Sequence, residues 1–119
     1  MRAPLRIMIA VALITVGASS GCTTDPDPAA RVWKRRCAAC HGPDGAGRTR
    51  FAEGRPYADL TDGRWKHGPD RAALRRLVAQ GDPASTMPPF AGTLTPEEID
   101  AIVDWTLSLP DRAGRGSAR

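Results

Sequence analysis

Residues 37–41 read Cys37-Ala38-Ala39-Cys40-His41, and this short stretch decides how the rest of the chain is interpreted. Two cysteines separated by two residues and followed directly by a histidine have the spacing of a c-type haem attachment site. In such a site each thiol adds across one haem vinyl group to form a thioether, and the histidine becomes an axial ligand of the iron. We therefore expect one covalent haem c, attached through Cys37 and Cys40, with His41 as its proximal ligand.

Other uses of a cysteine pair fit this sequence less well. A dithiol motif of the thioredoxin kind belongs in an alternating pattern of strands and helices, which the chain lacks. A structural zinc site needs four ligands. Beyond the motif, the chain that remains after the expected cleavage of an N-terminal signal peptide offers only His67. A simple Cys37–Cys40 disulfide leaves His41 without a role, although an interaction protein stapled in this way stays open as an alternative.

Met87 is the candidate for the second axial ligand. Met1 and Met8 lie in an N-terminal segment that we expect to be cleaved, so Met87 is the only methionine of the remaining chain. Two prolines follow it, and a proline biases the preceding residue toward extended backbone, which suits a loop that presents a sulfur atom. A methionine that fills a core is the alternative, but Met87 lies outside any apolar period. His67 is the competing ligand.

The first 21 residues have the pattern of a secretory signal peptide. Basic residues flank an apolar run over residues 7–16, which is shorter than the roughly 20 residues of a membrane-spanning helix, and small residues follow. Residues 19–22, Ser-Ser-Gly-Cys, are similar to a bacterial lipobox, and the chain has an odd third cysteine. We therefore expect lipid on Cys22 and a tether over residues 22–28. Ordinary cleavage that yields a soluble periplasmic protein stays open.

Length and charge narrow the class of protein further. The chain has 119 residues, 12 glycines, 11 prolines and 5% aromatic residues, which predicts one small domain with much loop. The formal net charge is +4, but from Cys22 onward there are 15 basic and 13 acidic residues and no basic stripe. We therefore expect no nucleic-acid partner.

Three helices and no long strand are predicted after the tether. Asp27 is a suitable N-cap for the first, which runs to the Cys-His-Gly-Pro break. The second spans about residues 70–80, with Gly81 as its C-terminal cap. The third begins at the Thr95-Pro96-Glu97-Glu98 capping box, and Pro110 is expected to end it.

Two segments of the chain have no predicted secondary structure. The segment over residues 42–69 is too long for a structureless loop in a small domain, so we expect it to wrap a bound group. Residues 111–119 are polar and contain glycine and arginine, and we expect a flexible tail there.

Residues 29–110 resemble a class I cytochrome c domain. The segment from Cys37 to Gly45 is similar to the family's haem-binding segment, and Met87-Pro88-Pro89-Phe90, 46 residues after His41, is similar to its distal loop. The resemblance implies an all-α fold in which three to four helices wrap around one haem.

In that family the first and last helices cross near an aromatic residue on each. In this chain these are Trp33 and Trp105, and Ala29 stands where many members have glycine at the crossing.

Residues 58–65 are similar to a segment of the c-type subunits of haem-copper oxidases. In such domains a proline carbonyl accepts a hydrogen bond from the proximal imidazole, and Pro56 is the nearest fit here. Ala58 occupies a position where relatives can have proline. The resemblance also places Trp65 and Phe90 in the haem pocket.

Partners for the haem propionates are expected from the same segment. Trp65 is a candidate through its indole N–H, and Arg64 or Lys66 through their charges. A packed tryptophan and solvated basic side chains are the alternatives.

The expected function is one-electron transfer between redox proteins by an exported carrier that is not itself an enzyme. The carrier is expected to be a monomer or an oxidoreductase subunit, held at a membrane by lipid on Cys22. Docking to an acidic donor or acceptor is expected at Lys34-Arg35-Arg36, for which a solvated helix face is the alternative. A haem-based sensor or small haem enzyme with a labile sixth ligand is the rival function.

Overall fold

The computed structural model describes residues 27–118. The expected signal peptide, the lipid site at Cys22 and all but the end of the tether lie outside this range. None of the helices in the described range combines the length and the hydropathy needed to cross a bilayer.

The described residues form helices joined by loops, with no β-strand among residues 27–118. The predicted all-α class is therefore confirmed. The elements are, in chain order, α1 (Pro28–Val32), the π-helical turn η1 (Trp33–Cys37), α2 (Ala38–His41), the 3₁₀ turn η2 (Pro56–Ala58), α3 (Arg71–Gln80), the 3₁₀ turn η3 (Pro83–Ser85), α4 (Pro96–Leu107) and α5 (Leu109–Ser117).

The first three elements form one continuous helical run. The Asp27 carboxylate accepts a hydrogen bond from the Ala29 N–H at 2.9 Å, which caps the run as predicted. Within η1 the helix widens, because the Ala38 N–H donates to the Trp33 carbonyl five residues back. The run ends at Gly42, whose φ of +81° is a backbone conformation suited to glycine.

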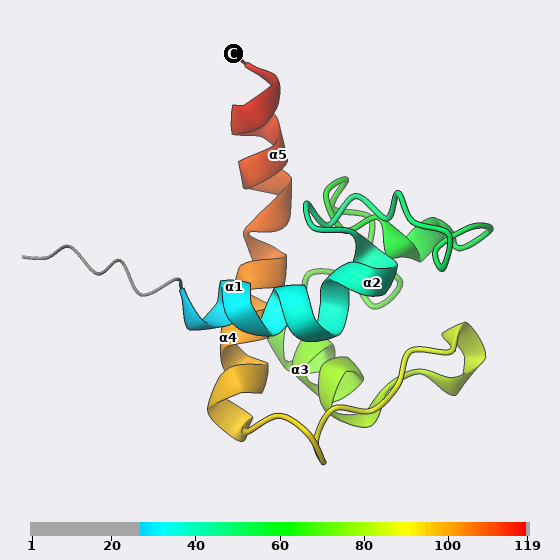
Figure 1. Ribbon diagram of the computed structural model, residues 1–119, viewed down its shortest axis with the longest axis vertical. Coiled ribbons are helices and arrows are strands. Elements are labelled where there is room, and N and C mark those ends of the chain that lie inside the picture. Colours follow the sequence, from blue (N-terminus) through cyan, green and yellow to red (C-terminus); the bar gives the residue numbers. More distant parts are fainter. Residues whose placement is uncertain (1–26, 119) are drawn as a thin grey trace, which may run out of the picture.

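Helices α1 and α3 both pack against α4, and α1 crosses it (Figure 1). Trp33 and Trp105 meet where the two helices cross, with ring centroids 6.4 Å apart, as the family resemblance implied. Ala29 is buried at this contact, so the crossing forms without glycine. The side chains of Ile102 and Val103 are fully buried at the centre of the core.

The predicted Gly81 cap of α3 and the predicted capping box of α4 are both present, and Asp70 is an additional N-cap of α3 that was not predicted. Asp70 accepts a hydrogen bond from the Ala73 N–H at 2.6 Å, and Gly81 ends α3. Thr95 and Glu98 form the predicted reciprocal capping box at the start of α4.

The chain after Pro110 differs from the prediction. Residues 111–117 are helical in α5, which extends beyond α4 and away from the rest of the fold (Figure 1). Helix α4 ends at Leu107, before Pro110, and Pro110 is the second residue of α5, where a proline in the first turn loses no intrahelical hydrogen bond. The Arg112 guanidinium lies 3.9 Å from the centre of the Trp105 ring, and this contact holds the start of α5 against α4.

Two loops extend to one side of the helices. The segment between α2 and α3 and the segment between α3 and α4 lie on the same side of the molecule (Figure 1). Leu109 packs against the first of these at Gly45, where an added Cβ would lie 2.7 Å from the leucine Cδ1. The helices and these two loops together enclose the cavity described next.

Candidate functional site

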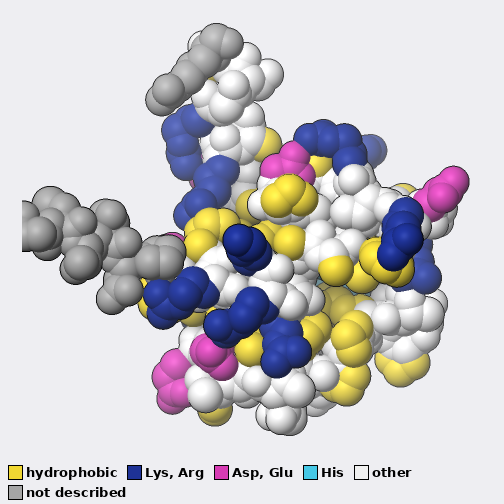
Figure 2. Space-filling model, in the orientation of Figure 1, with side chains coloured by type: hydrophobic (Ala, Val, Ile, Leu, Met, Phe, Trp, Pro, Cys, Tyr) yellow, Lys and Arg dark blue, Asp and Glu magenta, His cyan; other side chains and the backbone are white. Residues whose placement is uncertain are grey.

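A cavity of about 450 Å³ lies between the helices and the two loops. Its walls include all four side chains predicted to attach or ligate the haem: Cys37, Cys40, His41 and Met87. Figure 2 shows hydrophobic side chains between the two loops and basic side chains gathered beside them over α1 and η1. The fold thus brings together the donors that the sequence placed 46 residues apart.

The imidazole of His41 is held from the long loop. Its Nδ1 lies 2.9 Å from the carbonyl oxygen of Ala58. A carbonyl can only accept, so Nδ1 carries the proton and Nε2 is the nitrogen left for a metal. Burial lowers the pKa of His41, while the bond to Ala58 opposes that effect, and the neutral imidazole is the form that binds metals.

The prediction that Pro56 supplies this carbonyl is wrong. Pro56 lines the cavity, but it begins the turn η2 and Ala58 ends it. The turn therefore presents the Ala58 carbonyl to the histidine. The Gly47 backbone, with φ +66°, packs so closely that an added Cβ would lie 2.8 Å from the Ala58 carbonyl carbon, which fixes the turn against the histidine loop.

The two cysteine side chains are free and border the cavity at different depths. Cys37 is half-buried, and burial raises the pKa of its thiol to about 11, with a further contribution from the neighbouring Cys40. Cys40 is exposed, and its carbonyl accepts a hydrogen bond from the Thr49 hydroxyl at 2.7 Å.

Met87 is presented by a loop with defined backbone contacts. The Asp82 N–H donates to the Met87 carbonyl at 2.9 Å, and the Met87 N–H donates back to the Asp82 carbonyl at 3.1 Å. The Phe90 N–H donates to the Val78 carbonyl at 3.1 Å and so ties the end of the loop to α3. Phe90 lines the cavity, as does Met87.

The expected propionate partners have protein partners in this structure. The Trp65 indole N–H donates to the Leu60 carbonyl at 3.1 Å, five residues away in the same turn. Arg64 donates to Asp62 at 3.0 Å, and Lys66 to Asp82 at 2.7 Å. Trp65 and Lys66 line the cavity, and donation from Trp65 to a propionate stays a prediction beside this backbone contact.

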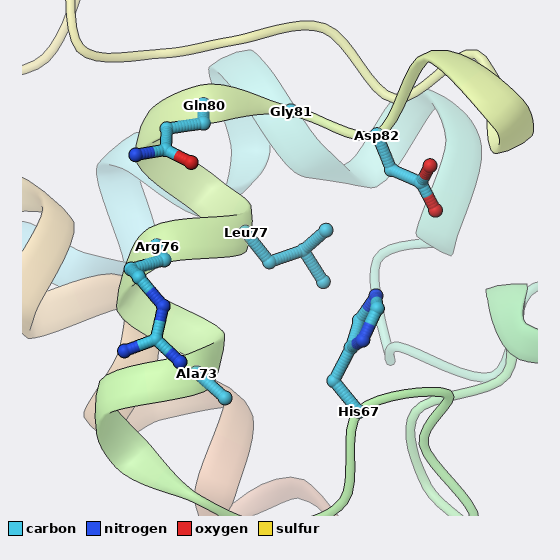
Figure 3. Close-up of a pocket in the computed structure, with 7 residues that line it drawn as sticks. All are labelled: His67, Ala73, Arg76, Leu77, Gln80, Gly81 and Asp82. Carbon is cyan, nitrogen blue, oxygen red and sulfur yellow. The ribbon is translucent and has the colours of Figure 1, made fainter.

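His67 lies at the edge of the cavity. It also borders a smaller hollow of about 230 Å³ beside α3, where its imidazole lies across from Asp82 and Leu77 (Figure 3). All three of these residues line both hollows. The competing ligand is therefore exposed on the cavity wall, whereas His41 is held by a backbone hydrogen bond.

Three cavity residues were not found from the sequence. Phe51 and Tyr57 are largely exposed aromatic side chains that also line the cavity, and Arg55 lies between them in the chain. Nothing in the sequence distinguished Arg55 from the many other arginines of the chain. Its role depends on a contact with a loop about 30 residues away.

The residues on the cavity wall fit a covalent haem. Two thiols, a neutral imidazole with one free nitrogen and a thioether are a donor set of the c-type kind. Most of the other side chains on the wall are apolar, among them Leu74, Val78 and Ile102. Such a lining suits a large hydrophobic cofactor with a few polar anchors.

Residues 24–105 match the family model described as cytochrome c oxidase, cbb3-type, subunit III. The chain belongs to this family. Its cofactor is accordingly covalently bound haem c, and its domain is a class I c-type cytochrome domain like those of haem-copper oxidase subunits.

Individual relatives agree with the family assignment. The chain is 41% identical over 73 residues to the cbb3-type cytochrome c oxidase subunit CcoP of Rubrivivax gelatinosus, which covers 61% of this chain and 22% of the relative. It is 38% identical over 79 residues to the subunit FixP of Bradyrhizobium diazoefficiens, covering 66% of this chain and 26% of the relative. The matches thus span about a quarter of the length of these curated relatives.

A solved structure shares the fold over nearly its whole length. The KustC0563 c-type cytochrome superposes with a TM-score of 0.59 at 28% identity, covering 68% of this chain and 95% of that one. The predicted cytochrome c fold with helices around one haem is therefore confirmed.

Proposed function

We propose that this chain transfers single electrons through a haem c attached to Cys37 and Cys40, with His41 and Met87 as its axial ligands. The observation that carries the proposal is that these four side chains line one cavity while the Ala58 carbonyl orients the histidine. Haem c supplies a one-electron Fe(III)/Fe(II) couple.

Each residue has a separate task in this proposal. The Ala58 carbonyl holds the Nδ1 proton of His41, which fixes the ring orientation and raises the basicity of Nε2. Met87 supplies a thioether, which favours ferrous iron and raises the reduction potential. With both axial positions filled, no site is left for a substrate, so the domain acts as a carrier and not as an enzyme.

The proposal is tested by visible spectra of the protein produced with c-type haem maturation machinery. The reduced protein is expected to keep its narrow bands when carbon monoxide is added. Met87→Leu keeps the side-chain size and removes the sulfur, so it should bind carbon monoxide and have a lower reduction potential. His67→Ala is the matched control and should behave like the original protein.

Two results would contradict the ligand assignment. Carbon monoxide binding by the unmodified protein would favour a sensor or haem enzyme with a labile sixth ligand. Absence of the sulfur-to-iron charge-transfer band from the unmodified oxidised protein, or carbon monoxide binding that appears in His67→Ala and not in Met87→Leu, would exclude Met87 as the ligand.

For the redox partner, the proposal is a protein with an acidic surface that docks at Lys34-Arg35-Arg36. All three side chains are exposed, and Arg36 also lines the cavity. Arg35 lies 4.0 Å from Glu98, so Lys34 and Arg36 are the better variants for a test.

Charge reversal at Lys34 and Arg36 should slow reduction by the anion ferrocyanide and weaken its salt dependence. Arg115→Glu, in the exposed part of α5, changes the charge by as much as either single reversal at Lys34 or Arg36 and should have little effect. Equal effects of both changes would exclude a local docking surface.

We propose that the domain works on the periplasmic side of a membrane, held by lipid on Cys22, either alone or as part of an oxidoreductase. The lipobox-like residues 19–22 support this location. In cells that produce the Cys22→Ser variant, the protein should be found in the soluble periplasmic fraction instead of the membrane fraction. An unchanged membrane fraction would exclude the lipid anchor.

A further inference from the structure

Arg55 connects the two loops that border the cavity. Its Nη1 donates to the Ser85 carbonyl at 3.1 Å and also to the Thr86 hydroxyl. Arg55 stands just before the turn η2, whereas Ser85 and Thr86 precede Met87. One guanidinium therefore joins segments that are about 30 residues apart in the chain.

On the proximal side, Arg55 belongs to the structure that orients His41. The Ala58 N–H donates to the Arg55 carbonyl at 3.0 Å, which closes η2. The Ala58 carbonyl then accepts the bond from His41 Nδ1. The main chain of Arg55 thus supports the histidine, while its side chain reaches the opposite loop.

On the distal side, the contact falls on a strained residue. Thr86 has φ +62°, the one left-handed residue other than glycine among residues 27–118. This conformation is unfavourable for a β-branched side chain unless its surroundings hold it in place. The Thr86 hydroxyl accepts from Arg55, and Met87 is the next residue, so the bond acts at the point where the loop turns toward the cavity.

We propose that Arg55 is a positioning residue that fastens the Met87 loop to the loop that orients His41. This inference rests on the proposed ligation by Met87. Breaking the contact raises the fraction of molecules in which the Met87 loop has moved away from the iron. An added ligand can bind only in that fraction, so its apparent affinity reports the strength of the contact.

The test measures imidazole binding to the oxidised haem protein. Arg55→Ala is expected to raise the apparent affinity about fivefold, the population change that corresponds to loss of roughly one net hydrogen bond. Thr86→Ala removes one of the two acceptors and should change the affinity in the same direction. Arg48→Ala is the charge-matched control in the same loop, since Arg48 pairs with Asp44, and it should leave the affinity unchanged.

A double variant separates this inference from the proposed function. In Met87→Ala the sixth position is already open, so adding Arg55→Ala should produce no further increase in imidazole affinity. A further fivefold increase in that background would mean that Arg55 acts on the iron site by another route, for example through its charge, and would overturn the inference.

The remaining outcomes are also distinct. If Arg55→Ala binds imidazole as the unmodified protein does while Met87→Ala binds it far more tightly, the positioning role is wrong and the ligation by Met87 stands. If Met87→Ala itself binds imidazole no more tightly, both ideas fail.

Discussion

Gly81 is the position where a single added methyl group should most directly disturb the Met87 loop. Its φ is +72° and its ψ is −178°, a combination essentially restricted to glycine. A Cβ built there lies 2.6 Å from the Met87 carbonyl oxygen, 2.7 Å from the Pro89 nitrogen and 2.8 Å from the Pro88 carbonyl carbon. Because all three atoms belong to the backbone, no side-chain rotation can relieve the overlap.

The expected cost of Gly81→Ala has two parts. The backbone conformation alone costs an alanine about 1–3 kcal/mol. The closest contact is about 0.8 Å shorter than the 3.4 Å at which ordinary contacts begin, so the loop must shift or remain compressed. Overpacking of this kind costs about 1–3 kcal/mol more, and we therefore expect a total loss of roughly 4 kcal/mol in the free energy of unfolding.

Gly68→Ala is the control for an added methyl group at a positive φ without overlap. Gly68 has φ +69°, and nothing lies within 4 Å of its added Cβ. Urea unfolding of the haem protein should show Gly81→Ala to be about 2 kcal/mol less stable than Gly68→Ala, which is the share assigned to overlap. The sulfur-to-iron charge-transfer band should weaken only in Gly81→Ala. Equal stability and equal spectra in the two variants would refute the steric argument.

Three further changes test other parts of the fold. Gly47→Ala should move the turn that holds His41 and weaken the Nδ1 hydrogen bond of the imidazole. The reduction potential should therefore be higher than in the control Gly54→Ala. Equal potentials of the two variants in a redox titration would contradict this role of Gly47. Thr95→Ala removes the N-cap of α4 and should cost about 1 kcal/mol of unfolding free energy in urea, where an unchanged midpoint would contradict the role of the cap. Leu109→Ala should cost about 2–5 kcal/mol because Leu109 is buried, and a loss below 1 kcal/mol would mean that the start of α5 is dispensable.

The sequence predicted the elements whose signals are local. Asp27 and Thr95 each cap a helix as expected, because an N-cap acts on backbone groups only two or three residues away. The cysteine–histidine motif and Met87 were also singled out from short runs of residues, and the structure places them on the wall of one cavity. The all-α fold around one haem followed from these segments together.

Two features that depend on contacts between distant segments were missed. The histidine acceptor is Ala58 and not Pro56, because the course of a long loop decides which carbonyl faces the imidazole. A backbone carbonyl has no residue type that would reveal it. The partner of Arg55 likewise depends on the folded arrangement of two loops.

The C-terminal segment shows a different limit. Its glycines and Pro110 favour a frayed tail when judged by intrinsic helix propensity alone. In the fold, Leu109 is buried against Gly45 and Arg112 lies on the Trp105 ring, so tertiary contacts hold the first turn of this segment. The exposed remainder of α5 continues from that turn, and intrinsic propensity does not explain it.

The π-helical turn η1 has a consequence for how the length of the chain can vary. A π turn holds one residue more than the α-helical turn that it replaces, yet the flanking helices keep their relative orientation. Removing one residue between Trp33 and Cys37 would convert η1 into an ordinary helical turn. Trp33 would still pack against α4, and the cysteines would still border the cavity. We therefore expect the fold to accept two lengths of chain between the aromatic crossing and the attachment motif, whereas a deletion within Cys37–His41 would destroy the spacing on which the site depends.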